Sequence, residues 1–217
     1  MDRLLLAVAG LAAALLSSPK TSAQPAERPE LSQGDSWAYV VHESGTFIRP
    51  GNFESVESYA VTEVFKRWGP TSGYAVARTV ATDSGGEAKT TYYSITVDLN
   101  DYARANASTS WQEAKWMQWP LQSGARWKFE IPLADGVRVW EAHVEGWEEV
   151  EVPAGRFKAI RIVYDMVQNP NPLVTWQSTR WYAPAVKTWI KKTDYGQIEA
   201  SMSLTRDTRE LKSYQVH

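Results

Sequence analysis

Short segments in which apolar and polar residues alternate recur along the chain, and they constrain its fold more than any other feature. Tyr93, Ile95 and Val97 alternate with polar residues, and residues 149–152 and 198–205 show the same pattern. A period of two predicts half-buried strands of antiparallel sheets. Turn formers rich in Pro and Gly separate these segments, as at residues 152–155, so we expect hairpin connections. The sequence therefore predicts a mainly β protein, and Gly155 is expected at positive φ in its turn.

Two segments of the chain resemble each other. Gly34-x-x-Trp37 is followed by an aromatic and an aliphatic residue at the same spacing as Gly124-x-x-Trp127. Tyr92-Tyr93 and Trp181-Tyr182 lie at a similar separation. Recurrence at a fixed period indicates repeated structural units. We expect one β domain over residues 34–217, built from two pseudo-repeated halves at about 34–115 and 116–217.

The first residues are typical of an export signal. An apolar run over residues 4–16 is shorter than the roughly 20 residues that a membrane-spanning helix needs. Small residues at Thr21 and Ala23 then favour cleavage before Gln24. We expect residues 1–23 to be a signal peptide, residues 24–33 a flexible leader, and the mature protein to be periplasmic or secreted without stable membrane insertion.

Composition narrows the function classes. The formal net charge of -2 gives no electrostatic surface for nucleic acid. The chain has no cysteine, which excludes disulfides and thiol chemistry, so its stability must come from burial. Its histidines, His42, His143 and His217, are scattered, and no metal site or cofactor is expected.

Catalytic patterns are weak. Gly34-Asp35-Ser36 is similar to the nucleophile block of Gly-Asp-Ser hydrolases, but no aspartate stands three residues before the late histidine, His217. Glu149 and Glu151 lie about 6.5 Å apart on one strand face, whereas a glycosidase pair normally flanks the sugar from opposite sides. We therefore expect no catalytic residue and no enzymatic activity, with a secreted hydrolase kept as an alternative.

Several motifs of the second half occur together in the same order. These are Trp-Pro-Leu-x-x-Gly-x-x-Trp at residues 119–127, Val-Pro-Ala-Gly-x-Phe at 152–157 and Trp-Tyr-x-Pro-x-Val at 181–186. The combination resembles a widespread group of uncharacterised bacterial envelope proteins, over roughly residues 117–214. The resemblance implies a curved antiparallel sheet or open half-barrel, and it implies no catalytic residues.

Tryptophans are the last informative feature. The chain has 11 of them, and most are expected to fill the core of a protein that lacks disulfides. An aromatic load of this size also suits a cleft for an apolar molecule. Our leading hypothesis is a non-catalytic envelope protein that binds a lipid, another hydrophobic small molecule or a partner protein. The residues expected to line the site are Trp116, Trp119, Trp181 and Tyr182. A carbohydrate-binding module with exposed tryptophans is the alternative.

Overall fold

The computed structural model describes residues 24–45, 51–68, 71–82, 87–103, 112–170, 174–198 and 203–217. The predicted signal peptide, residues 1–23, lies outside them. Within these ranges, no helix is both long enough and apolar enough to cross a membrane.

Strands account for most of the described chain. In sequence order they are β1 (Ser36–Gly45), β2 (Gly51–Trp68), β3 (Thr71–Thr82), β4 (Lys89–Thr96), β5 (Asp101–Ala103), β6 (Gln112–Ala114), β7 (Arg126–Leu133), β8 (Gly136–Val152), β9 (Gly155–Gln168), β10 (Val174–Ala183), β11 (Thr188–Ile198) and β12 (Ser203–Gln215). A short 3-10 turn, η1 (Pro184–Val186), joins β10 to β11.

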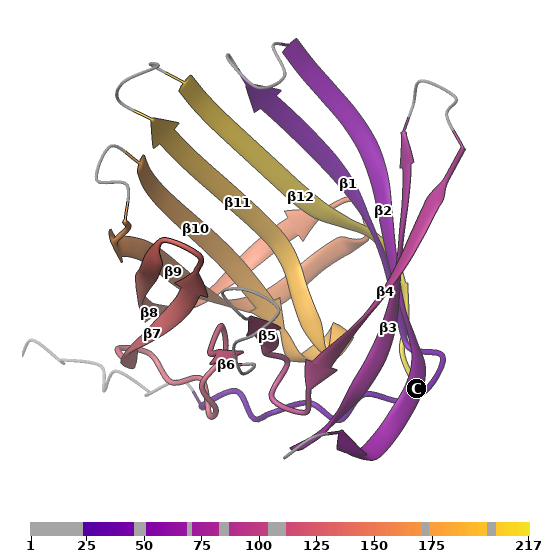
Figure 1. The fold of residues 1–217 in the computed structure, drawn as a ribbon. Coiled ribbons are helices and arrows are strands. Elements are labelled where there is room, and N and C mark those ends of the chain that lie inside the picture. The colour runs from indigo at the N-terminus through magenta and orange to yellow at the C-terminus, as the bar shows by residue number, and fades with distance from the viewer. Residues whose placement is uncertain are drawn as a thin grey trace, which may run out of the picture.

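All the strands belong to one sheet with the order β6-β5-β4-β3-β2-β1-β12-β11-β10-β9-β8-β7. Every pairing is antiparallel, and β1 pairs with β12 at the middle of the sheet. The sheet curls around a concave side, and its edges β6 and β7 do not pair in the described residues (Figure 1). The prediction of a curved, open antiparallel sheet is thus confirmed.

Side chains alternate between the two faces, as the sequence pattern predicts. In β9, Ile160, Ile162 and Tyr164 are fully buried on the concave side, whereas Arg161 between them is half-buried on the other face. Buried side chains form two clusters, one centred on β7 to β10 and one on β1 to β3 with β11 and β12. The second cluster includes Ala159, which is next to Ile160 in β9 and so faces the opposite side, and buried side chains therefore lie on both faces of the sheet.

The two Gly-x-x-Trp segments adopt the same local structure. Gly34 has φ 93° and Gly124 has φ 85°, each just before a strand, in a region that favours glycine. The N–H of Gly34 donates to the carbonyl of Val61, and that of Gly124 donates to the carbonyl of Val144. The indole N–H groups of Trp37 and Trp127 donate to the backbone carbonyls of Val186 and Lys115, at 2.7 Å in both cases. Whether the halves arose by duplication stays a hypothesis.

The segment before β1 differs from the flexible leader predicted for residues 24–33. Ala26 forms an antiparallel bridge with Leu121, through two backbone hydrogen bonds of 2.9 and 2.8 Å. Leu31 is buried in the second core cluster, and its N–H donates to the Tyr74 hydroxyl. That prediction is wrong. Although the segment is mostly polar, its two buried apolar residues, Ala26 and Leu31, attach it to the sheet.

The turn between β8 and β9 follows the sequence prediction. Val152 pairs with Gly155, and Gly155 has φ 127°. Val150 and Val152 are buried while Glu149 and Glu151 are exposed. The positive φ of Gly155 is therefore confirmed.

Candidate functional site

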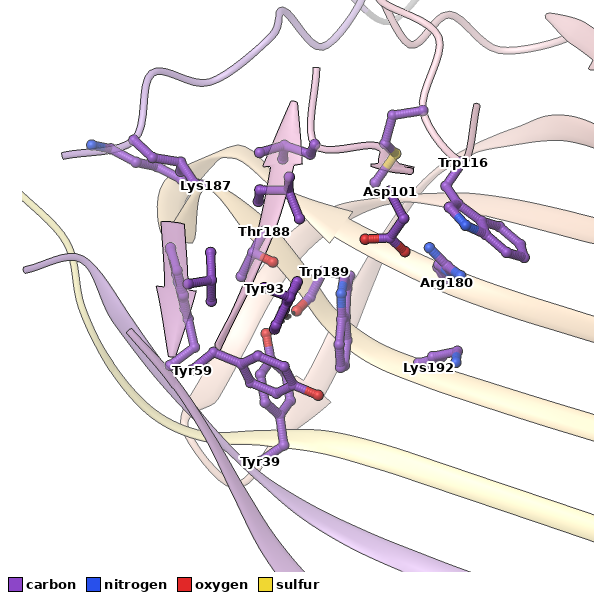
Figure 2. A pocket seen from close by; sticks show the side chains of 16 residues that line it. Tyr39, Tyr59, Tyr93, Asp101, Trp116, Arg180, Lys187, Thr188, Trp189 and Lys192 are labelled. Carbon is purple, nitrogen blue, oxygen red and sulfur yellow. Dashed lines mark hydrogen bonds between the residues drawn. The ribbon is translucent and has the colours of Figure 1, made fainter. Parts of the chain in front are cut away.

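A cavity of about 210 Å³ lies on the concave side of the sheet (Figure 2). Strands from both halves of the chain form its walls, and the segment after β6 contributes Trp116 and Met117. Most of the lining is aromatic or aliphatic, including Trp37, Tyr39, Tyr59, Tyr93, Ile95 and Trp189. We call this space the aromatic cavity.

Its tyrosines are neutral hydrogen-bonding groups. The Tyr39 hydroxyl donates to the Trp189 carbonyl at 2.9 Å, and the two rings stack with centroids 4.1 Å apart. Burial raises the pKa of Tyr39 well above its ordinary value. Burial and the nearby Glu57 carboxylate raise the pKa of Tyr59 to about 12. Both phenols therefore stay protonated at neutral pH and provide no phenolate nucleophile.

A buried ion network supports one wall of the aromatic cavity. Glu57 is 3% exposed and accepts hydrogen bonds from Arg78 at 2.5 Å, Arg209 at 3.0 Å and the Tyr59 hydroxyl at 2.6 Å. Burial alone would raise the pKa of Glu57, but the hydrogen bond from Arg78 and the charge of Arg209 outweigh burial and hold this pKa below its ordinary value. Glu57 is therefore a charged group that ties β2 to β3 and β12.

A second cavity of about 350 Å³ adjoins the first. Side chains that line this second cavity alone include Arg138, Trp140, Trp176, Ser178 and Asp194. We call it the arginine cavity. Asp101, Trp116, Arg180 and Lys192 line both cavities, so these residues form the junction between the two spaces.

One wall of the arginine cavity depends on a glycine. Trp176 of β10 pairs across the sheet with Gly196 of β11. A Cβ atom at Gly196 would lie only 2.1 Å from the Trp176 ring. The absence of a side chain at Gly196 therefore allows the indole to lie directly on the backbone of β11.

Charges of both signs meet at the junction. The Arg180 guanidinium carbon lies 4.3 Å from the ring centroid of Trp116 and 5.0 Å from that of Tyr164. Lys192 forms an ion pair of 2.6 Å with Asp194. Figure 2 shows the Asp101 carboxylate and the Arg180 guanidinium beside Trp116. The junction therefore combines cations, a carboxylate and an aromatic face.

The surroundings of the junction shift two pKa values. Asp101 is accessible to solvent, yet the surrounding protein raises its pKa by burial, against the opposing charges of Arg180 and Lys192. Burial lowers the pKa of Lys192, and repulsion from Arg180 adds to this effect. Arg180 and Lys192 both line the junction, so two positive charges lie close together there.

Three of the residues predicted from the sequence lie on the concave side. Trp116 lines both cavities. The Trp119 indole N–H donates to the Asp98 carbonyl at 2.9 Å, and its ring meets Tyr182 edge-on with centroids 5.1 Å apart. Tyr182 is fully buried in the core, where burial raises its pKa. Trp119 and Tyr182 therefore pack against each other but line neither cavity.

Trp181 lies on the opposite face of the sheet. Its indole N–H donates to the Glu148 carboxylate, and the cationic groups of Arg161 and Lys191 lie 5.6 and 5.8 Å from its ring. Consecutive residues of a strand face opposite sides, so Trp181 and Tyr182 do not line one site.

Sequence reasoning missed the charged residues of the two cavities, which are Asp101, Arg138, Arg180, Lys187, Lys192 and Asp194. One signal in the sequence could have indicated Arg180, namely the alternation of side chains between the two faces of a strand. Arg180 stands two residues before Tyr182 in β10 and so shares its inward face.

The hydrolase motif does not form a triad in the described residues. Asp35 is fully buried and accepts hydrogen bonds from the backbone N–H groups of Ser32 and His217, both at 2.8 Å. One ring nitrogen of His217 lies 3.2 Å from the Asp35 carboxylate, but the other lies 3.2 Å from the Gln215 amide rather than beside a serine hydroxyl. Lys187 also pairs with Asp35 at 3.2 Å. This arrangement anchors the end of the described chain.

No protein-family model matches the chain, and no curated protein matches it. Among solved structures, one is of a Bacteroides fragilis protein that is described, provisionally, as exported and that has a YmcC-like fold. Its TM-score with this chain is 0.49 at 12% identity, and the alignment covers 88% of this chain and 99% of that chain. A provisionally named lipoprotein of Parabacteroides distasonis gives 0.49 at 12% identity, covering 88% of this chain and 100% of its own. The hypothetical lipoprotein YmcC of Escherichia coli gives 0.33 at 12% identity, covering 80% and 83%.

Proposed function

We propose that this protein is a non-catalytic protein of the cell envelope that binds an apolar small molecule on the concave side of its sheet. The observation that carries this proposal is the aromatic cavity, with Tyr39, Tyr59, Tyr93 and Trp189 in its wall. Ligand sites are typically concave, mostly apolar and supplied with a few polar groups, which is the composition of this lining.

The energetics favour an apolar occupant. Each buried methylene of a ligand gains about 0.8 kcal/mol when it leaves water. The junction residues connect the aromatic cavity to the larger arginine cavity, so an elongated molecule can extend from one into the other. The Tyr39 hydroxyl already donates to the Trp189 carbonyl, and Glu57 already accepts from Tyr59, Arg78 and Arg209, so an apolar chain displaces none of these hydrogen bonds.

Neither alternative is favoured by a specific observation. A carbohydrate-binding module would present tryptophans in an exposed plane, but none of the tryptophans whose side-chain burial the structure describes is exposed. A hydrolase that used the acid pair considered from the sequence would need both carboxylates in a cavity. Glu149 and Glu151 instead lie exposed along β8, and Glu151 pairs with Arg156 at 2.9 Å.

A titration with N-phenyl-1-naphthylamine tests the proposal, because this neutral dye emits strongly when it leaves water. Ile95→Trp replaces an aliphatic side chain of the aromatic cavity with a bulkier indole ring. Tyr92→Trp introduces the same ring at a position that is 74% exposed on the other face of β4. We expect dye binding to the parent protein and to Tyr92→Trp, and none to Ile95→Trp. Equal dye emission from the two variants, both folded by thermal melting, contradicts the proposal.

A further inference from the structure

The lining of the arginine cavity carries more positive than negative charge, whereas the lining of the aromatic cavity is mostly apolar. Three cations, Arg138, Arg180 and Lys192, and two carboxylates, Asp101 and Asp194, line it. Asp194 is engaged by Lys192 at 2.6 Å. In the described residues, Arg138 and Arg180 form no ion pair within 4.0 Å. Two arginines are therefore opposed by one carboxylate, that of Asp101.

Unused hydrogen-bonding groups gather around the same space. Four buried side-chain atoms without a partner in the described residues belong to its lining: Nε of Arg138, Nε of Arg180, Nε1 of Trp140 and Oγ of Ser178. Ser178 is 2% exposed and Trp140 is 4% exposed. Each of these groups can donate a hydrogen bond, and buried donors without acceptors are costly. A lining of this kind is complementary to a ligand that carries hydrogen-bond acceptors.

The position of Arg180 suits it to receive such an acceptor. Its guanidinium group rests on Trp116 and Tyr164, so the side chain is held without a carboxylate partner. Guanidinium groups bind carboxylates and phosphates through paired N–H donors. Because Arg180 lies at the junction, an anion bound there can continue into an apolar chain in the aromatic cavity.

We propose that the apolar ligand carries an acidic oxyanion head group, a carboxylate or a phosphate, which binds to Arg180 and Arg138 in the arginine cavity. This inference rests on the proposed function, since it specifies the class of molecule that the same site takes. The Asp101 carboxylate weakens binding of the anion by charge repulsion, because it lies at the junction beside the same cations.

Displacement of N-phenyl-1-naphthylamine by ligands with one tail and different head groups tests the inference. The competitors are dodecanol, dodecanoate and dodecyl phosphate, with inorganic phosphate as a free anion. A charge-assisted hydrogen bond is strong enough that we expect either acid to bind about tenfold more tightly than dodecanol. Inorganic phosphate should not displace the dye. A preference for one of the two acids identifies the head group.

Three variants separate a binding role from a structural one. Arg180→Gln should remove the preference for acids and leave dodecanol binding unchanged. Asp101→Asn should strengthen acid binding alone, which a purely structural role of Asp101 would not do. The matched control is Arg161→Gln on the outer face, where Arg161 rests on Trp181 as Arg180 rests on Trp116.

The outcomes distinguish this inference from the proposed function. Equal binding of dodecanol and dodecanoate, unaffected by Arg180→Gln and Asp101→Asn, overturns the acidic head group and leaves the apolar site in place. Binding of inorganic phosphate as tight as that of dodecyl phosphate overturns the amphiphile in favour of a free anion. Failure of the dye and all the dodecyl compounds to bind overturns both proposals.

Discussion

The guanidinium carbon of Arg180 lies over the indole ring of Trp116, 4.3 Å from its centroid. This contact joins β10 to the segment that follows β6. The Trp116 carbonyl also accepts a hydrogen bond of 2.5 Å from Tyr164 in β9. The two contacts hold Trp116 at the junction of the two cavities, where the segment after β6 meets the concave face of the sheet.

Trp116 and Trp181 should therefore respond differently to substitution. Trp116→Leu removes an aromatic surface from both cavities, and we expect the dissociation constant for N-phenyl-1-naphthylamine to rise about tenfold. Trp181→Leu changes the outer face and should leave that constant unchanged. Dye titrations of the two variants, with thermal melts to establish folding, measure this difference. A loss of affinity in Trp181→Leu as large as that in Trp116→Leu would place the site elsewhere.

Gly196→Ala should destabilise the protein through a single steric contact. The added methyl group would meet the Trp176 ring at 2.1 Å, so the indole must move, at a cost of about 1–3 kcal/mol for overpacking. Urea unfolding measures this loss. When Trp176→Leu is already present, adding Gly196→Ala should cost much less, because the clashing ring is gone. Strictly additive losses in the double variant would rule out the steric explanation.

Local features of the fold could be predicted from the sequence because local rules determine them. The alternation of Val150 and Val152 with glutamates gave the correct faces of β8, and the Pro-Ala-Gly turn placed Gly155 at positive φ. Alternation failed at residues 198–205, expected to be one strand. There β11 ends at Ile198 and β12 begins at Ser203, antiparallel to it. A pattern of period two does not by itself show where the chain reverses direction.

The candidate site depended on contacts between distant parts of the chain. Arg180 and Lys192 look like solvated charges in sequence, since nothing local shows that Trp116 and Asp101 lie beside them. Trp181 and Tyr182 were grouped because both are aromatic, although adjacent strand residues point in opposite directions. The alternation of faces along β10 would have placed Trp181 and Tyr182 on opposite sides of the sheet. Which residues lie beside each of them follows only from the order of the strands.

Glu57 should make stability depend on pH in the acid range. Its pKa in the folded protein lies below the ordinary value of 4.5, so its charged form favours folding. That contribution is fully present above pH 4.5 and is lost as the pH falls through the lower folded pKa. We expect Glu57→Gln to lose about 3 kcal/mol at pH 7, since Arg78 and Arg209 lose their common partner. Its unfolding free energy should then fall less steeply in acid.

Urea unfolding from pH 7 to 3 measures this dependence. Glu149→Gln is the control, because Glu149 is exposed on β8, and this variant should preserve the acid dependence of the parent protein. A Glu57→Gln variant whose stability declines in acid as steeply as that of the parent would show that Glu57 does not supply the charge-dependent stability.

Native mass spectrometry of protein purified gently from the envelope of its own cell tests the central claim most directly. We predict a population whose mass exceeds that of the polypeptide by one apolar small molecule, present in the parent protein and in Tyr92→Trp. The same population should be absent from Ile95→Trp, in which a ring fills the aromatic cavity. Parent protein found only at the mass of the polypeptide, or an added mass that Ile95→Trp retains, would contradict a ligand site on the concave side of the sheet.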